Sequence, residues 1–222
     1  MSPRAPTLET LPLNSDVFVN CPFDDGYLPC FEALLFAITL CGYRIRCALE
    51  GSDGGEIRFD KLCRLIEASD HTFHDLSRTQ LEDQGLPRFN MPFEYGLMMG
   101  ARHFGGKRQR RKQACVMVAE LFVLPRYLSD VAGNDPAAHG SDPQQVIRIV
   151  RDHLHYDPAG RRLPGTQHLT TLFGKFRDDL PALAARARLT LEETHARRSY
   201  RNYMDLLRSF RDALPEIARG AD

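Results

Sequence analysis

The sequence predicts an α/β protein with a doubly wound parallel sheet, followed by a helical C-terminal extension. Short runs of β-branched and aromatic residues alternate with longer segments whose apolar residues recur at helical spacing, and the connections between them are short. Beyond about residue 120 the strand-like runs fade and only helical periodicity remains. Parallel strands joined through helices take right-handed crossovers, which limits the topologies to consider.

The first strand, the first helix and the second strand are expected within the first fifty residues. Residues 16–20 (DVFVN) form a β-branched and aromatic run that stops at Cys21 and Pro22, which is typical of a buried strand. Residues 28–41 carry apolar side chains at helical spacing, and Gly42 follows where glycine commonly ends a helix. Residues 43–49 indicate a second strand, and the glycine-rich acidic segment 50–57 indicates a loop.

The alternation continues to residue 119. Apolar residues between 59 and 66 predict a second helix, and residues 70–77 predict a third strand. A polar loop over 78–90 precedes a third helix over 91–102, in which Pro92 is tolerated in the first turn. The remaining segments are a fourth strand over 114–119 and helices over 144–154, 168–186 and 191–218. We therefore expect a flexible N-terminus (1–14), an α/β domain (15–155) and a helical C-terminal region (156–222).

Composition indicates a soluble cytoplasmic protein. The 222 residues are 43% hydrophobic, with 29 basic and 29 acidic side chains, so net charge gives no reason to expect a membrane or nucleic-acid partner. The six cysteines form no CxxC pair and most lie in apolar runs, which favours buried free thiols in a reducing compartment. Residues 1–13 lack the apolar core of a signal peptide, and no apolar run approaches the length that spans a membrane, so we expect a soluble intracellular protein.

Several nucleotide and metal motifs are absent or incomplete. The loop over 20–26 lacks the GxGxxG spacing that admits a pyrophosphate, which argues against an ordinary Rossmann dehydrogenase. Residues 100–107 (GARHFGGK) fail as a P-loop because the glycine spacing is off by one and Arg108 replaces the magnesium-binding hydroxyl. The basic run 107–112 is expected to be a solvated loop. His71 and His74 should point to opposite faces of a strand, so we expect no metal site.

Glu94 is the candidate catalytic residue. The carboxyl ends of parallel strands meet at one edge of an open sheet, where ligands bind, and Glu94 should lie just beyond that edge near the start of a helix. A carboxylate beside a sugar can stabilise an oxocarbenium-like transition state or attack the sugar carbon. Aromatic faces and hydroxyl-binding acids at this edge suit a nucleoside-like ligand. The residues expected to bind it are Cys21, Phe23, Asp24, Leu49, Asp75, Ser77, Asn90 and Phe93.

Both central acids also have a structural interpretation. Glu94 could cap its own helix, because acids favour the first turn. Asp75 is as compatible with a turn or cap residue as with a ligand contact.

Three segments together resemble the TIR-like superfamily of bacterial α/β domains, which is related in fold to nucleoside 2-deoxyribosyltransferases. They are SDVFVNCPFDD at the first strand, LIEASDHTFHDLS through the second helix and third strand, and NMPFEYGLMMG at the next helix. The resemblance covers roughly residues 15–120 and implies a flavodoxin-like sheet. Enzymatic TIR domains cleave NAD at the nicotinamide–ribose bond with a glutamate in the helix after the third strand. The deoxyribosyltransferases use a glutamate in an FE-x-G segment as nucleophile, and both comparisons imply Glu94.

The resemblance implies an NAD nucleosidase or ADP-ribosyl cyclase, for which NAD is the substrate and no cofactor is needed. Bacterial proteins of this kind often serve antiphage defence, which leaves room for a defence-system partner protein. In TIR assemblies the loop that aligns with residues 50–57 packs between subunits, and the last predicted helix carries an apolar stripe, so we expect a homo-oligomer. The chain departs from the usual TIR pattern at Asn20-Cys21-Pro22, where serine is usual, and it has no tryptophan. Two alternatives stay open. One is a nucleoside or nucleotide deoxyribosyltransferase-like hydrolase. The other is a non-catalytic nucleotide-sensing or oligomerising module, and the departures from the TIR pattern favour this second alternative.

Overall fold

The structure is a computed structural model that describes residues 14–51, 54–78, 88–121, 128–131 and 135–215. Its centre is an all-parallel sheet of strands β1 (Asp16–Asn20), β2 (Arg44–Cys47), β3 (His71–Asp75), β4 (Gln113–Val118) and β5 (Ala137–Ala138). The strand order is β2-β1-β3-β4-β5, which confirms the predicted doubly wound fold. The expected flexible N-terminus lies outside the described residues, except for Asn14.

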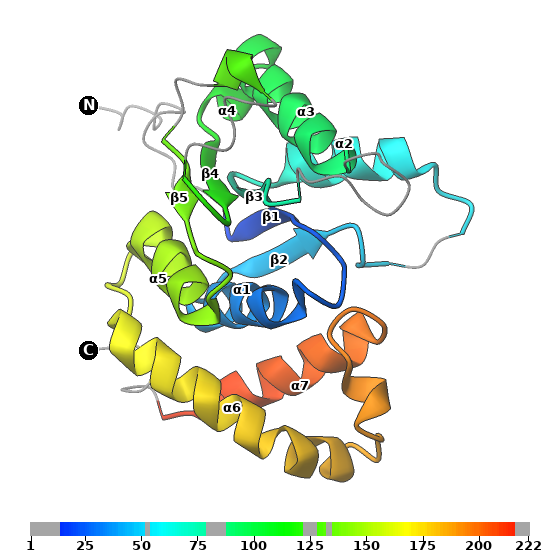
Figure 1. Ribbon diagram of the computed structural model, residues 1–222, viewed down its shortest axis with the longest axis vertical. Helices are drawn as coiled ribbons and strands as arrows, with labels where there is room; N and C mark the ends of the chain where they lie inside the picture. Colours follow the sequence, from blue (N-terminus) through cyan, green and yellow to red (C-terminus); the bar gives the residue numbers. More distant parts are fainter. Residues whose placement is uncertain (1–13, 52–53, 79–87, 122–127, 132–134, 216–222) are drawn as a thin grey trace, which may run out of the picture.

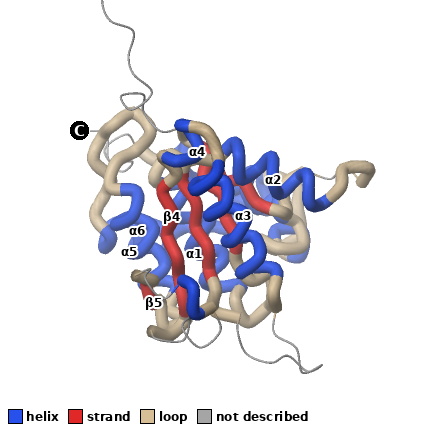
Figure 2. Tube along the Cα trace, turned by 90° about the horizontal axis from the view of Figure 1, so that it is seen from above, coloured by secondary structure: helices blue, strands red, loops and turns tan. Residues whose placement is uncertain are grey.

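Helices cover both faces of the sheet (Figure 1). On one face lie α2 (Arg58–Ala68), α3 (Asn90–Phe104) and the one-turn α4 (Lys107–Arg110), and Figure 2 shows these helices in front of the strands. On the other face lie α1 (Leu28–Leu40) and α5 (Pro143–Leu154). The C-terminal helices α6 (Thr166–Arg186) and α7 (Tyr200–Ala213) form a further layer against α1. Single 3-10 turns occur at Ser129–Val131 and Glu192–Thr194.

The C-terminal helices share the core of the α/β domain. Almost every residue of α1 from Cys30 to Leu40 is buried, because the helix is covered by the sheet on one side and by α6 and α7 on the other. The ring of Phe36 lies 5.2 Å from that of Phe173 and 6.4 Å from that of Phe210. The helical region expected over 156–222 is thus packed directly onto the domain expected over 15–155.

The central strands are buried on both faces, which explains their polar interior residues. All five residues of β1 and of β3 are buried. His71 packs against Tyr43 and His153, whereas His74 packs against Phe18 and Tyr95 in the opposite core. The two histidines therefore lie on opposite faces of the sheet, as predicted from the strand period.

The expectation that residues 107–112 form a solvated loop is wrong in part. Residues 107–110 form α4, and this basic segment binds the carboxyl end of α2. The ammonium group of Lys112, a residue only 2% exposed, donates to the carbonyl oxygens of Ile66 (2.6 Å) and Ser69. Arg108 donates to the carbonyl of Ala68 (3.0 Å). Cations at the carboxyl end of a helix hydrogen-bond its free carbonyl groups and interact favourably with the helix dipole, so residues 107–112 have a structural role.

Three further differences concern short elements and one thiol. Strand β5 has only two residues and was not expected. The last helix begins at Tyr200 and not at residue 191, because residues 192–194 form a separate 3-10 turn. Cys63 is exposed, while the other five cysteines are buried free thiols.

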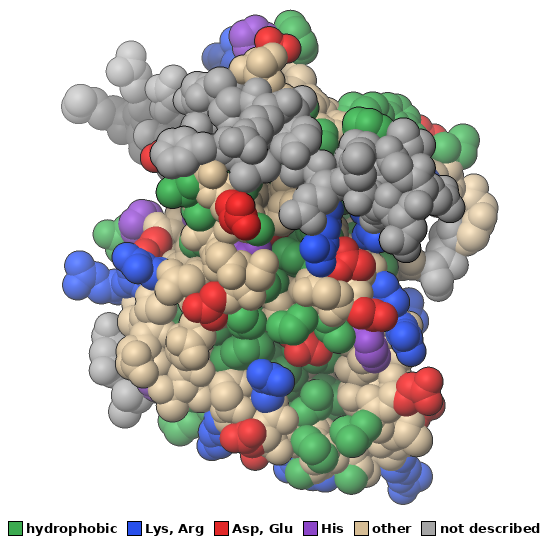
Figure 3. All heavy atoms as spheres, viewed as in Figure 1, with side chains coloured by type: hydrophobic (Ala, Val, Ile, Leu, Met, Phe, Trp, Pro, Cys, Tyr) green, Lys and Arg blue, Asp and Glu red, His purple; other side chains and the backbone are tan. Residues whose placement is uncertain are grey.

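The surface carries charges of both signs. Figure 3 shows basic and acidic side chains interspersed over the described part of this face, in keeping with the balanced composition. Within the described residues, no helix combines the length and the apolarity that crossing a membrane requires.

Candidate functional site

The predicted site residues gather around the carboxyl ends of β1, β2 and β3. Cys21 follows β1 directly, Leu49 lies two residues beyond β2, and Asp75 is the last residue of β3. Helix α3, which carries Glu94, begins at Asn90. Asn20 joins these parts, because its side-chain amide donates to the Met91 carbonyl (2.8 Å) and lies 3.0 Å from His74 Nδ1. The start of α3 is thereby attached to β1 and β3, which fixes the position of Glu94.

Glu94 lies on the buried face of α3, next to Tyr95 and one turn from Met91 and Met98. The residue is 6% exposed, and no hydrogen bond or ion pair to its carboxyl is found among the described residues. The amino end of α3 has no side-chain cap and no acid in its first turn. The capping interpretation of Glu94 is therefore wrong.

Burial changes the acid strength of Glu94. Desolvation raises the pKa of the Glu94 carboxyl from 4.5 to about 7, while the nearby positive charge of Arg58 acts in the opposite direction. A carboxyl with such a pKa exists in both protonation states near neutral pH. Strongly shifted pKa values of this kind are more frequent at functional sites than elsewhere in a fold.

Two aromatic rings lie at the amino ends of α2 and α3. Phe59 is 47% exposed and Phe93 is 54% exposed, with ring centroids 6.3 Å apart. Asn90 is also exposed at the start of α3. Sequence reasoning identified Phe93 and Asn90 but missed Arg58 and Phe59. Both residues could have been identified from their position in the first turn of the second helix, because the amino end of that helix faces the same sheet edge.

Asp75 is held entirely by the protein. It is fully buried, and its Oδ2 accepts from the Tyr27 hydroxyl (2.6 Å) and lies 2.9 Å from His139 Nε2. Its Oδ1 accepts from the Ser77 backbone N–H (2.9 Å), which makes a turn of the kind that aspartate forms locally. Burial raises the pKa of the Tyr27 hydroxyl well above its ordinary value, and Asp75 adds to the effect, so Tyr27 remains a donor. Asp75 therefore acts as a structural centre and leaves no oxygen for a ribose.

His139 does not convert Ser77 into a nucleophile. The Ser141 backbone N–H donates to His139 Nδ1 (3.0 Å), so the ring carries its proton on Nε2. That nitrogen lies 3.0 Å from Ser77 Oγ and also contacts Asp75. In a catalytic triad the serine and the acid contact opposite ring nitrogens, whereas here both contact the same one. Tyr27 and His139 were not identified from the sequence, because they come from segments far from Asp75.

The first loop is also tied to the protein. Asp24 forms a two-pronged ion pair with Arg78 (2.8 and 3.0 Å), which lowers the pKa of the Asp24 carboxyl although its burial acts the other way. Phe23 is partly buried, with its ring edge-on to Phe31 at 5.3 Å. Cys21 is buried, and desolvation raises the pKa of its thiol well above the ordinary value, with Asp75 next in effect. These residues support the edge of the sheet and do not supply a nucleophile.

The structure thus separates the predicted residues into two groups, with Leu49 outside both. Glu94, Phe93 and Asn90 lie at the amino end of α3, joined there by Arg58 and Phe59. The second group is held in other protein contacts or buried, and comprises Cys21, Phe23, Asp24, Asp75 and Ser77. Leu49 is partly buried and lines a different cavity beside α7.

No three metal-binding side chains converge anywhere in the described ranges. Comparison of the chain with protein-family models, with curated proteins and with solved structures found no match.

Proposed function

We propose that this chain is an NAD-directed glycosidase of TIR-like fold in which Glu94 acts on the ribose carbon that carries nicotinamide. The observation that carries the proposal is the environment of Glu94: a buried carboxyl without a hydrogen-bond donor among the described residues. Buried structural acids are normally paired or hydrogen-bonded, because leaving them unpartnered is costly. An unpartnered acid at the ligand-binding edge of an α/β sheet supports a functional role.

Cleavage of the nicotinamide–ribose bond requires little from the protein beyond one well-placed negative charge. The C–N glycosidic bond breaks with its electron pair going to nicotinamide, which is cationic in NAD and leaves as a neutral molecule. The positive charge then develops on the ribose, where the Glu94 carboxylate stabilises it or forms an ester with it. Water attacks the same carbon and loses a proton, which yields ADP-ribose.

The other residues around Glu94 suit the rest of this ligand. The half-exposed rings of Phe59 and Phe93 offer flat apolar faces for a nicotinamide or adenine ring. Arg58 provides a cation beside the acid, suited to a phosphate oxygen. Asp75 and Ser77, which the sequence suggested as ribose ligands, act as positioning residues that hold the end of β3.

A second acid would be needed for neutral nucleosides. Their base leaves as an anion unless an acid protonates it, so a hydrolase or deoxyribosyltransferase uses a proton donor in addition to a nucleophile. Among the described residues, Asp24 and Asp75 at this edge are bound by Arg78 and by Tyr27. Their engagement favours a substrate whose leaving group is already cationic.

Nicotinamide release from NAD, followed by chromatography, tests the proposal. We expect activity in the wild-type chain and a loss of at least about 100-fold in Glu94→Gln, the size of effect typical of a lost catalytic charge. Glu192→Gln, on an exposed turn, is the matched control and should keep wild-type activity. Repeating the assay across protein concentrations reveals whether assembly completes the site.

Three results would contradict the mechanism. Wild-type activity in Glu94→Gln would remove the residue from the chemistry. Turnover of deoxynucleosides but not of NAD would favour the deoxyribosyltransferase-like alternative. Binding of NAD without any turnover, unchanged in Glu94→Gln, would favour a nucleotide-sensing module.

A further inference from the structure

A cavity of about 600 Å³ lies between the edge strand β2 and the first turns of α7. One wall is formed by Ile45 within β2 and by Leu49, Glu50 and Gly51 beyond the carboxyl end of that strand. The facing wall is formed by the segment that begins α7. The volume falls within the range of small-molecule sites, and the lining comes from two distant parts of the chain.

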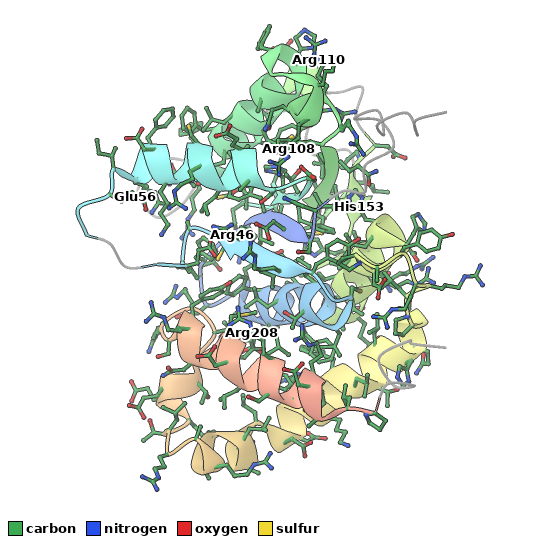
Figure 4. All side chains as sticks on the ribbon, turned by 180° about the vertical axis from the view of Figure 1, so that it is seen from behind. Arg46, Glu56, Arg108, Arg110, His153 and Arg208 are labelled. Carbon is green, nitrogen blue, oxygen red and sulfur yellow. The ribbon has the colours of Figure 1, made fainter. Side chains whose placement is uncertain are left out.

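The charge of this cavity is strongly unbalanced. Four arginines line it, namely Arg197, Arg198, Arg201 and Arg208. Among the described residues that line it, Glu50 is the one acid, and its carboxylate is paired with Arg46 at 2.7 Å. Figure 4 shows Arg208 on α7 and Arg46 on the neighbouring strand β2. In a chain with no net charge, so local an excess of guanidinium groups favours an anionic ligand.

Two of the four guanidinium groups are available to such a ligand. Arg197 contacts Asp25 (3.1 Å) and the Phe23 carbonyl (2.7 Å). Arg208 pairs with Asp205 of its own helix (3.0 Å). In contrast, Arg198 and Arg201 are exposed, and neither forms an ion pair with any described residue.

Backbone groups add to the attraction. Helix α7 has 14 residues, and its N-cap residue Ser199 makes no side-chain cap. The backbone N–H groups of Tyr200, Arg201 and Asn202, all lining residues, find no acceptor among the described residues. Free N–H groups and the positive end of the helix dipole favour an anion, as the arginines do.

The rest of the lining is apolar. Ile45, Leu49 and Met204 contribute side chains, and the ring of buried Tyr200 lies with its hydroxyl against the Cys47 thiol. Arginines bind phosphate in a two-pronged manner, and an apolar wall beside them suits a nucleobase. We propose that this cavity binds a nucleotide with two or more phosphates, its phosphates on Arg198, Arg201 and the start of α7.

This site is separate from Glu94. Helix α7 lies on the α1 side of the sheet, whereas α3 lies on the opposite side (Figure 1). None of the residues that line the cavity is in the group around Glu94. The proposal therefore goes beyond the proposed function and does not rest on it.

Calorimetric titration of the full chain with ADP, adenosine and inorganic pyrophosphate tests the proposal. The test variant is Arg198→Ala/Arg201→Ala. The matched control is Arg102→Ala/Arg186→Ala, which removes two exposed helical arginines that do not line the cavity. Glu94→Gln is titrated in parallel to separate the two sites.

We expect ADP to bind the wild type, the control and Glu94→Gln equally, and the test variant about tenfold more weakly, because charge-assisted contacts to phosphate are lost. Pyrophosphate should show the same order of affinities among the four proteins. Adenosine should bind far more weakly than ADP, and added salt should reduce the affinity for ADP. No ADP or pyrophosphate binding to the wild type at about 1 mM, a weak-binding limit, would overturn the proposal. Equal affinity in the test variant would overturn it too. ADP binding lost only in Glu94→Gln would assign the ligand to the Glu94 site and leave the proposed function standing.

Discussion

Replacing Glu94 with glutamine removes a charge that the folded state accommodates poorly. The pKa of the Glu94 carboxyl rises from 4.5 to about 7 on burial, so between these pH values the folded chain keeps a proton that the unfolded chain has lost. The folded state then binds more protons, and the free energy of unfolding falls as pH rises. The stability contribution is fully present below pH 4.5 and is lost as pH rises through about 7.

The size of the effect follows from the shift. A difference of about 2.5 pKa units corresponds to about 3 kcal/mol at about 1.36 kcal/mol per unit, which is an upper limit above pH 7. A glutamine side chain has nearly the same shape as the glutamate that it replaces, and it cannot ionise. We therefore expect Glu94→Gln to match the wild type near pH 4.5 and to exceed its free energy of unfolding by up to about 3 kcal/mol at pH 8. For a chain of this length that is about 6–12 °C in Tm.

Urea and thermal unfolding at pH 5 and pH 8 measure this difference directly. Glu192→Gln should show no pH-dependent difference from the wild type, since Glu192 is exposed. A variant that is more stable yet inactive would show that the chain keeps Glu94 charged at a cost in stability, as functional sites often do. If the gap between Glu94→Gln and wild type is the same at pH 5 and pH 8, the carboxyl is not desolvated and the reasoning fails.

Three further outcomes follow from individual contacts. The kcat/KM for NAD should rise about tenfold between about pH 6 and pH 8 as Glu94 ionises with a pKa of about 7, and a flat profile would exclude Glu94 as the required carboxylate. Asp75→Asn should lower the free energy of unfolding by about 2–4 kcal/mol, because the buried side chain accepts hydrogen bonds from three donors and an amide cannot accept all of them. Exposed Asp152→Asn is the control, and an equal loss of stability in that variant would refute the prediction. Lys112→Met should cost about 1–3 kcal/mol by leaving the α2 carbonyls unpaired, whereas exposed Lys107→Met should cost under about 0.5 kcal/mol, both measured by urea unfolding.

The main elements could be predicted because their signals are local. The run over 16–20 and the helical spacing over 28–41 correspond closely to β1 (Asp16–Asn20) and α1 (Leu28–Leu40). Strand β5 could not be predicted, since Ala137 and Ala138 carry no β-branched or aromatic side chain. Its pairing with β4 exists only because the chain returns to the open edge of the sheet.

The basic segment 107–112 shows how composition misleads. A run of charges suggests solvation, and nothing near it in sequence says that the end of α2 lies alongside. Lys112 bonds to carbonyl groups more than 40 residues away, and only the packed helices bring them together.

Hydrophobic period and chain order were enough to predict a parallel sheet with Glu94 just past the carboxyl ends of its strands. The surroundings of Glu94 and Asp75 could not be predicted, because they depend on packing between distant segments. The tertiary structure placed Arg58 and Phe59 near Glu94, bound Asp75 to Tyr27 and His139, and set four arginines against β2. These contacts join segments far apart in the chain, where local propensity has no influence and packing determines which side chains meet.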